Sequence, residues 1–323
     1  IAQRNADIAA TGKSEIPAVM ESTAIPGFGY AYLDNHDWLK EFYRESHPST
    51  EHNLSISGGN EFTDYYLSGR FYSSEGVFKV GNEDFKKYSL RAKGSLMVRP
   101  WLKFTNNMSL SGDQNYIPIS ATTNSIQRYM QHCLAPSAPL RNPDGSWTPA
   151  AGISGYAAYY EGNNFLNDDY IYLREKISAD IDLIKEVLKF QADYSYNYTG
   201  RTATRVRNYV TYSKEPGVYI LESTSVGNGM TENKYDTRYH AVNAYTTYSP
   251  RLGENNSLIV LLGYNTEWSK YVYTSAERKG FLSNKYSFNL MDGESSITAG
   301  GNEWAYVGAF YRVNYAYKGR YLA

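Results

Sequence analysis

The 323-residue sequence contains one cysteine, Cys133, so no disulfide can form within the chain. It also lacks any apolar run of about 18 residues, and its mean hydropathy is −0.55, which together exclude a helical membrane span. A transmembrane β-barrel needs no such run, because only every second residue of its strands meets lipid. The formal net charge is −1, so there is no broad electrostatic footprint for nucleic acid.

Residue patterns that carry catalysis are also missing. The five histidines show no metal-ligand spacing, and no serine stands in a nucleophile-elbow motif. Two carboxylate pairs, Asp168 with Asp169 and Asp180 with Asp182, have no convergent acid or base partner in the sequence. We therefore expect no enzymatic activity, no catalytic residue, no cofactor and no metal.

What the sequence does contain is alternation of apolar and polar residues, clearest over residues 51–112. In the third alternating run Tyr88, Leu90 and Ala92 point to one face, while the residues between them point to the other. The apolar face would meet a second sheet in a soluble sandwich and lipid in a membrane barrel, where the charged face would line a wet lumen. On the barrel interpretation the lumen-facing charges include Lys87, Arg91, Lys93, Asp180 and Asp182. We expect these charges to brace a plug through ion pairs or to line a polar path.

Tyrosine is unusually frequent, with 33 residues, and many lie near the ends of the alternating runs. Amphipathic rings favour membrane interfaces, so this distribution predicts aromatic girdles. The alternative is a tyrosine-rich soluble β protein with a sugar-binding surface.

The lengths of the connections between the runs discriminate between a barrel and a sandwich better than the alternation does. Residues 1–50 are predicted to be a loop region that includes a short helix starting at Trp38, capped by Asn35 or Asp37. About ten strands follow in residues 51–323, with short turns near 59–61, 99–101, 184–187, 250–256 and 318–320. Longer connections fall near 73–84, 113–167, 200–235 and 272–302, the second with a possible helix at 122–134. Strict alternation of short and long connections is typical of outer-membrane barrels and not of Greek-key sandwiches.

An ordered series of short motifs resembles the first barrel region of SusC-like TonB-dependent transporters of Bacteroidota outer membranes. The series is Asp37-Trp38, His52-Asn53-Leu54-Ser55-Ile56-Ser57-Gly58-Gly59, Tyr65-Tyr66-Leu67-Ser68-Gly69, Glu75-Gly76-Val77, Asp84-Phe85-Lys86-Lys87-Tyr88-Ser89-Leu90-Arg91, Trp101-Leu102-Lys103-Phe104 and Phe310-Tyr311-Arg312-Val313-Asn314-Tyr315-Ala316-Tyr317-Lys318-Gly319-Arg320-Tyr321. The resemblance spans nearly the whole chain, and the long loops carry least of it.

The resemblance implies an all-β, antiparallel transmembrane β-barrel of the large plugged kind with about 22 strands, of which this chain would supply about half. It implies TonB-dependent import of an oligosaccharide or oligopeptide across the outer membrane of a Gram-negative bacterium. The implied partners are a SusD-like surface lipoprotein, the TonB-ExbB-ExbD complex and outer-membrane lipid. We expect this sequence to be an internal piece of a longer protein. The plug domain and the TonB box would then lie outside it. A passive porin or adhesion barrel, and a soluble carbohydrate-binding sandwich, remain alternatives.

The long connection at 113–167 is the predicted ligand contact. Its rings Trp147, Tyr156, Tyr159 and Tyr160 could stack on sugars or wall a peptide site, with Asn163 as a hydrogen-bonding group. The motif Asp144-Gly145-Ser146-Trp147 also fits a plain turn. In the next loop, Arg201, Arg205 and Arg207 are expected to be solvated or to contact an anionic surface.

Overall fold

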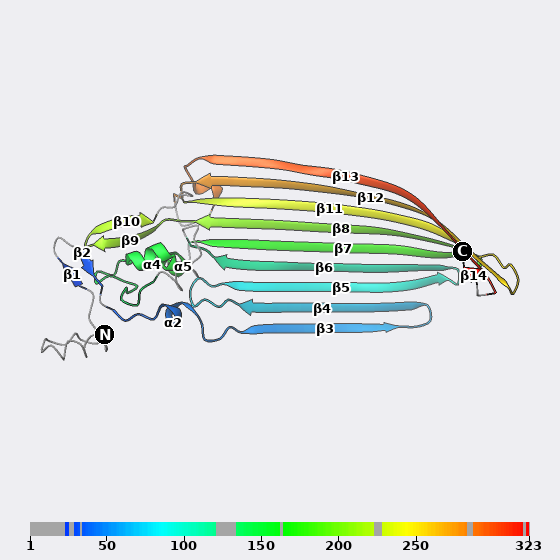
Figure 1. Cartoon of the computed structure of the whole chain (residues 1–323), viewed down its shortest axis with the longest axis horizontal. Coiled ribbons are helices and arrows are strands. Elements are labelled where there is room, and N and C mark those ends of the chain that lie inside the picture. Colours follow the sequence, from blue (N-terminus) through cyan, green and yellow to red (C-terminus); the bar gives the residue numbers. More distant parts are fainter. Residues whose placement is uncertain are drawn as a thin grey trace.

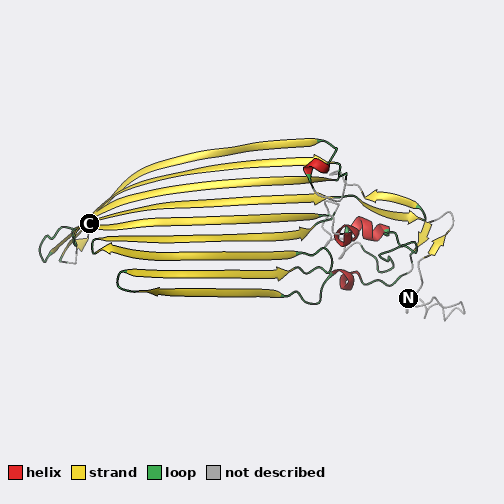
Figure 2. Cartoon of the chain, turned by 180° about the vertical axis from the view of Figure 1, so that it is seen from behind, coloured by secondary structure: helices red, strands yellow, loops and turns green. Residues whose placement is uncertain are grey.

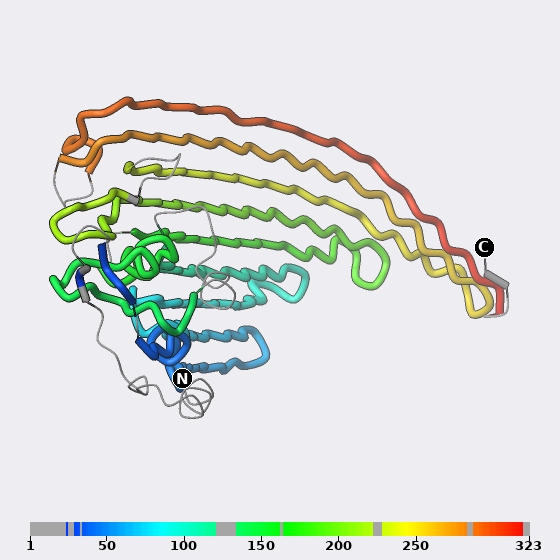
Figure 3. Tube along the Cα trace, turned by 60° about the vertical axis from the view of Figure 1, so that its left-hand side comes forward, coloured from blue at the N-terminus to red at the C-terminus, as the bar shows by residue number. Residues whose placement is uncertain are grey.

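The computed structural model describes residues 23–25, 29–32, 34–120, 134–161, 164–222, 228–282, 287–318 and 321–322. Ten strands form one antiparallel sheet in the order β14-β13-β12-β11-β8-β7-β6-β5-β4-β3 (Figure 1). They are β3 (Ser49–Gly59), β4 (Thr63–Glu75), β5 (Asp84–Arg99), β6 (Leu102–Pro118), β7 (Phe165–Ile184), β8 (Leu188–Arg207), β11 (Gly229–Tyr248), β12 (Asn256–Lys279), β13 (Ser295–Tyr317) and β14 (Tyr321–Leu322). Within the described residues β3 and β14 are edge strands and the sheet is curved and open (Figure 3), as a segment of a barrel is. The all-β antiparallel prediction is confirmed.

Short and long connections fall at opposite ends of the sheet (Figure 2). We call these the turn end and the loop end. At the turn end, Asn60 Oδ1 accepts hydrogen bonds from the backbone N–H groups of Phe62 and Thr63, both at 2.9 Å. Glu186 and Lys318 complete other tight turns with φ of 63° and 49°. The separation is what short periplasmic turns and long extracellular loops produce.

The two faces of the sheet differ in polarity. Cross-strand register places Leu67, Ala92 and Met108 side by side on one face, with Arg91, Ser109 and Arg174 on the other. Large side chains of the apolar face are exposed, with Leu54 at 80%, Val307 at 71% and Tyr311 at 78%. In a sandwich a second sheet would cover them, whereas here they form the broad apolar surface that a bilayer covers.

The strands run further than the alternation indicates, so the loops predicted at 200–235 and 272–302 are wrong in extent. β8 continues to Arg207, β11 begins at Gly229, β12 ends at Lys279 and β13 begins at Ser295. Strands of about 9–11 residues suffice to cross a bilayer, and β12 has 24 residues. Beyond the apolar band the apolar face also becomes polar, as at Thr202 and Thr204, so the period of two disappears from the sequence while the ladder of hydrogen bonds continues.

The remaining elements gather at the loop end (Figure 1). They are β1 (Thr23–Ile25) paired with β2 (Gly29–Ala31), β9 (Val210–Glu215) paired with β10 (Val218–Glu222), α2 (Trp38–Phe42), α4 (Pro149–Ser154), α5 (Tyr156–Glu161) and the 3-10 turn η1 (Phe288–Leu290). The predicted short helix is confirmed as α2, where Asp37 Oδ1 accepts the Lys40 N–H at 3.0 Å. The predicted helix at 122–134 lies almost entirely outside the described residues. In the part of the chain that is described, no helix is both long and apolar enough to cross a membrane.

Candidate functional site

The loop end has its own hydrophobic core, formed by segments far apart in the sequence. We call it the loop cluster, and its buried residues are Trp38, Phe42, Phe78, Trp147, Ala151, Tyr156, Ala157, Ala158, Tyr159, Val210 and Tyr212. Phe42 is fully buried, and its ring centroid lies 4.4 Å from that of Phe78 and 5.6 Å from that of Tyr159. The connections before β3, between β4 and β5, before β7 and after β8 thus pack as one unit.

Local sequence fixes how the long connection before β7 enters this core. Thr148 Oγ1 accepts the Ala151 N–H at 3.2 Å and caps α4, whose first residue is Pro149. Gly155, with φ of 89°, ends α4 in the left-handed conformation and lets α5 begin at once. The two short helices therefore place Tyr156 and Tyr159 in the core.

Most of the predicted ligand-contact residues are buried, which corrects their expected role. Trp147 is 4% exposed, Tyr156 0% and Tyr159 7%, so these rings hold the loops together and cannot stack on a ligand in this structure. Only Tyr160, at 57% exposure, faces outward, and Asn163 lies outside the described residues. The sequence predicted accessible rings in this connection, because the residues that bury them come from three other connections.

Two of the buried rings, those of Tyr156 and Trp147, have their polar groups paired. Tyr156 donates its hydroxyl hydrogen to Glu41 Oε1 at 2.9 Å, which joins α5 to α2. Burial first, and this hydrogen bond second, raise the pKa of Tyr156 well above its usual range, so it stays a neutral donor. Trp147 Nε1 donates to Glu161 Oε1 at 2.8 Å. The hydrogen bonds therefore fix the orientation of these two rings, in addition to their burial.

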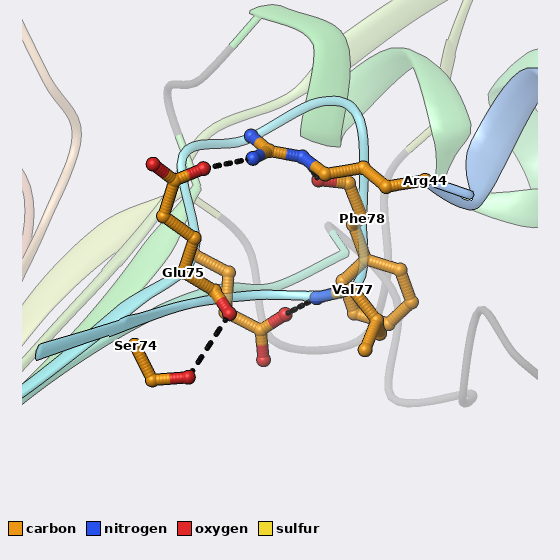
Figure 4. A network of polar contacts seen from close by, with 6 residues as sticks. Arg44, Ser74, Glu75, Val77 and Phe78 are labelled. Atoms are coloured by element: carbon orange, nitrogen blue, oxygen red, sulfur yellow. Dashed lines mark hydrogen bonds and ion pairs between the residues drawn. The ribbon is translucent and has the colours of Figure 1, made fainter. Parts of the chain in front are cut away.

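A network at the base of the cluster ties α2 to the β4–β5 connection (Figure 4). Arg44 forms an ion pair with Glu75, and its Nε donates to the carbonyl oxygen of Phe78 at 2.9 Å. Glu83 Oε2 accepts the Val77 N–H at 3.2 Å from across the same connection. The loop cluster is therefore anchored directly on the end of β4.

The charges predicted to face the lumen all lie on the polar face by register. Lys87 pairs with Asp113 at 3.6 Å, and Arg91 Nε donates to Asn107 Oδ1 at 3.2 Å. Asp180 pairs with Lys189 at 3.4 Å. Lys93 lies opposite Asn107, and Asp182 opposite Lys189, on that same face. Several of these charges thus find partners within the wall itself; contact with a plug stays a prediction.

About midway along the strands the polar face forms a hollow of about 510 Å³. One side carries the cations Arg91, Arg174 and Lys176. Toward β11 the wall carries a chain of hydrogen bonds in which Asn243 Nδ2 donates to Asp193 Oδ1 at 3.0 Å, with Lys176 Nζ 3.3 Å from the same oxygen. The hollow is hydrophilic and changes from cationic to neutral and acidic across the sheet.

Nearer the loop end, the same face carries a feature that the sequence did not reveal. We call it the aromatic band, consisting of Tyr170, Tyr172, Arg201, Tyr235, Tyr271 and Tyr273. Three pairs of rings are stacked, with centroids 5.8 Å apart for Tyr170–Tyr172, 6.5 Å for Tyr235–Tyr271 and 6.1 Å for Tyr271–Tyr273. The band crosses the four neighbouring strands β7, β8, β11 and β12.

Arg201 joins the two halves of the band. Its guanidinium lies 5.2 Å from the Tyr170 ring centroid and 5.3 Å from that of Tyr235. Asp168 holds it in a bidentate pair, with Nε–Oδ1 and Nη2–Oδ2 distances of 2.7 and 2.8 Å. Arg201 is therefore part of a strand and a built wall, not of the solvated loop that the sequence predicted.

The band corrects part of the girdle prediction. Tyr170, Tyr172 and Tyr271 lie on the polar face, away from lipid, whereas Tyr65, Tyr194 and Tyr311 lie on the apolar face. Parity within the longer strands would have separated the two sets once their ends were known. Partly exposed rings, hydroxyls and a fixed guanidinium can stack on flat or apolar faces of a ligand and hydrogen-bond its edges. Among the described residues no cluster of three or more His, Cys, Asp or Glu could hold a metal.

Comparison with known proteins connects this architecture to transporters. No protein-family profile matches the chain. TonB-dependent receptor P3 and TonB-dependent receptor P26 of Formosa agariphila are each 23% identical to it, over 303 and 306 residues. Each alignment covers 89% of this chain and 28% of the relative, so the chain spans just over a quarter of the length of these receptors.

Solved structures show the same fold. The RagAB peptide transporter matches with a TM-score of 0.69 and 19% identity over 90% of this chain and 32% of the other. The RagAB peptide importer in its "closed-closed" state matches with a TM-score of 0.67, also at 19% identity, covering 90% and 33%. The open sheet thus has the fold of one segment of a large transmembrane β-barrel. The relatives, the fold and the motifs agree, and the chain is similar to a barrel segment of SusC-like TonB-dependent receptors.

Proposed function

We propose that the full-length protein imports a nutrient oligomer, an oligosaccharide or an oligopeptide, across the outer membrane of a Gram-negative bacterium. Import depends on TonB-ExbB-ExbD acting through a plug, and a SusD-like lipoprotein captures the ligand at the surface. The two relatives are named TonB-dependent receptors, and the RagAB structures are named a peptide transporter and importer, which supports this class of function over catalysis.

The aromatic band is the observation that carries the proposal. A passive pore requires only a wet wall, whereas stacked rings interrupted by a fixed guanidinium give an oligomer successive contact points. The band lies between the loop cluster and the charged hollow, so a ligand entering from the loop end meets rings first and charges second. In this arrangement the loops and the aromatic band select the ligand, and the strands hold them in place.

The test is uptake by cells that carry the full-length gene with two tyrosines of the band replaced. Each stacked ring contributes about 0.5–1.5 kcal/mol, or about 2- to 12-fold in affinity, so Tyr235→Ala with Tyr271→Ala should weaken uptake by the product of two such factors. The control pair is Tyr311→Ala with Tyr315→Ala, which removes the same rings from the apolar face.

Labelled glycan and peptide mixtures identify the cargo, and deletion of TonB tests energy coupling. Uptake that persists without TonB would refute the proposal in favour of a passive porin. An equal loss of uptake in the double variant of the band and in the control double variant would do the same. Co-purification of a surface lipoprotein with the wild-type protein tests the partner.

A further inference from the structure

Arginines recur along the polar face of β8 toward the loop end. Arg201, Arg205 and Arg207 share that face, because residues two or four positions apart in a strand point the same way. The sequence placed all three in a loop, whereas β8 continues to Arg207. A ligand that enters from the loop end therefore passes Arg207 and Arg205 before it reaches Arg201 and the rings of the aromatic band.

The charge of Arg201 is neutralised within the wall, and that of Arg205 is not. Asp168 of the neighbouring strand β7 uses both carboxylate oxygens to hold Arg201, at 2.7 and 2.8 Å. Arg205 is exposed, and it forms no ion pair with any residue that the structure describes. Glu277 lies in the same cross-strand row but two strands away through Thr231, which places the backbones of Glu277 and Arg205 about 9–10 Å apart.

Arg207 adds a second positive charge about 6–7 Å from Arg205 along β8. Burial first, and then the charge of Arg205, lower the pKa of Arg207, against the smaller opposing effect of Glu277. The Nε of Arg207 is shielded from solvent and has no hydrogen-bond partner in the described part of the chain, so this residue acts on a ligand through its charge. Two like charges on one strand repel each other, and an anionic group beside them relieves that repulsion.

The hollow on the other side of the aromatic band repeats this excess of free cations. Arg91 and Arg174 lie in one cross-strand row, two strands apart, and both are exposed. Neither takes part in an ion pair with another described residue. Of the two acidic residues that line the hollow, Asp193 is paired with Lys176 at 3.3 Å and Glu175 lies on the opposite face. A wall whose nearby acids are engaged and whose cations are not attracts anions.

We propose that the cargo of this protein is an acidic oligomer, which carries carboxylate or sulfate groups along its chain. This inference rests on the function proposed above and names the chemistry of the cargo at the same site. Units of the oligomer lie on the rings of the aromatic band, while its anionic groups accept hydrogen bonds from Arg205 on the loop side and from Arg174 on the side of the hollow. The planar guanidinium suits this role, because it offers two parallel donors to the oxygens of an anion.

The test uses cells that produce the full-length protein and two labelled mixtures, one of glycans and one of peptides. Each mixture contains acidic and neutral oligomers of matched length, and anion-exchange chromatography separates the imported material by charge. An exposed ion pair changes affinity by about 1.4- to 5-fold, so two of them should enrich acidic over neutral oligomers by about 2- to 25-fold. The mixture that supplies the acidic material identifies the cargo as a glycan or a peptide.

Two failures are distinguishable in this assay. TonB-dependent import of neutral oligomers to the same extent as acidic ones, or in preference to them, would overturn the inference and leave the proposed function standing. Absence of TonB-dependent import from both mixtures would refute the proposed function itself.

Variants assign the preference to the two arginines. Arg205→Gln combined with Arg174→Gln should abolish the enrichment, and Arg205→Lys alone should retain part of it, because the positive charge remains. Arg238→Gln is the matched control, since it removes the same charge from the opposite face of β11 and should leave the enrichment unchanged.

Each variant must reach the outer membrane in the wild-type amount and keep the heat-dependent gel mobility of a folded barrel. If the double variant lowers import of acidic and neutral oligomers by the same factor, the arginines contact an acidic segment of the plug or of the lipoprotein, and the assignment to the cargo is wrong.

Discussion

Replacing Phe42 with alanine should destabilise the packing of the loop cluster while leaving the sheet intact. Phe42 is fully buried among the rings of Phe78, Tyr156 and Tyr159, which come from two other segments, so its loss leaves a cavity that short, separately anchored connections cannot close. Substitutions of this kind cost about 3–5 kcal/mol, which raises the open population of the cluster by two to three and a half orders of magnitude, up to complete opening. The sheet is held by its own ladder of hydrogen bonds and by lipid, and should not change.

Limited proteolysis of the full-length protein in intact cells measures the opening. Cleavage in the connection before β7 follows the open population when opening and closing are fast relative to cleavage. Leu39→Ala, in the same helix but at a side chain 51% exposed, is the control and should leave the cleavage rate within a few-fold of wild type. If Phe42→Ala and Leu39→Ala are cleaved at the same rate, the four connections do not form one cooperative unit and the reasoning fails.

Three smaller perturbations test other parts of the structure. Asp37→Ala removes the cap of α2 and should destabilise the cluster by about 1 kcal/mol, a smaller rise in cleavage than Phe42→Ala gives. Hydrogen bonds from Ser146 and then Tyr30 hold the pKa of Asp144 below its usual range, so the stabilisation of its turn is present above the ordinary carboxyl pKa and is lost as pH falls through the lowered value. Hydrogen-exchange protection of the Ser146 amide should therefore fall in acid in wild type and be low and independent of pH in Asp144→Asn. Arg201→Lys cannot reproduce the bidentate pair or the flat contact with two rings, and should reduce uptake, whereas Lys214→Arg, at an exposed position of β9, should not.

The alternation of residues predicted the barrel because lipid and water impose it directly. Residues such as Leu90 and Arg91 must face different media, so their order in the chain reports their faces. The same logic failed beyond the apolar band, where water lies on both sides of the sheet. There Thr202 and Lys234 are acceptable on either face, and only the cross-strand hydrogen bonds, which sequence does not display, continue the strands.

The candidate site was less predictable, for a different physical reason. Tyr156 resembles a ligand-stacking ring in sequence, but it packs against Trp38 and Phe42, which come from a connection more than one hundred residues away along the chain. Local capping was readable, as Asp37 showed, because a cap acts on its own helix. Long-range packing has no comparable local signature.

Tyrosine serves two purposes in this chain. The two sets of tyrosines differ both in the face of the sheet on which they lie and in their position along the strands. On the apolar face Tyr65, Tyr248 and Tyr317 lie close to the turn end, where a ring with a polar tip suits a lipid interface. On the polar face the rings of the aromatic band lie nearer the loop end of the strands than the charged hollow does. Rings that served only as interfacial anchors would not be bridged by an arginine fixed in a bidentate pair, because that arrangement restricts both the guanidinium and the two rings it joins. The band is therefore a wall built with fixed geometry, which is what selective contact with a passing oligomer requires and what a membrane anchor does not.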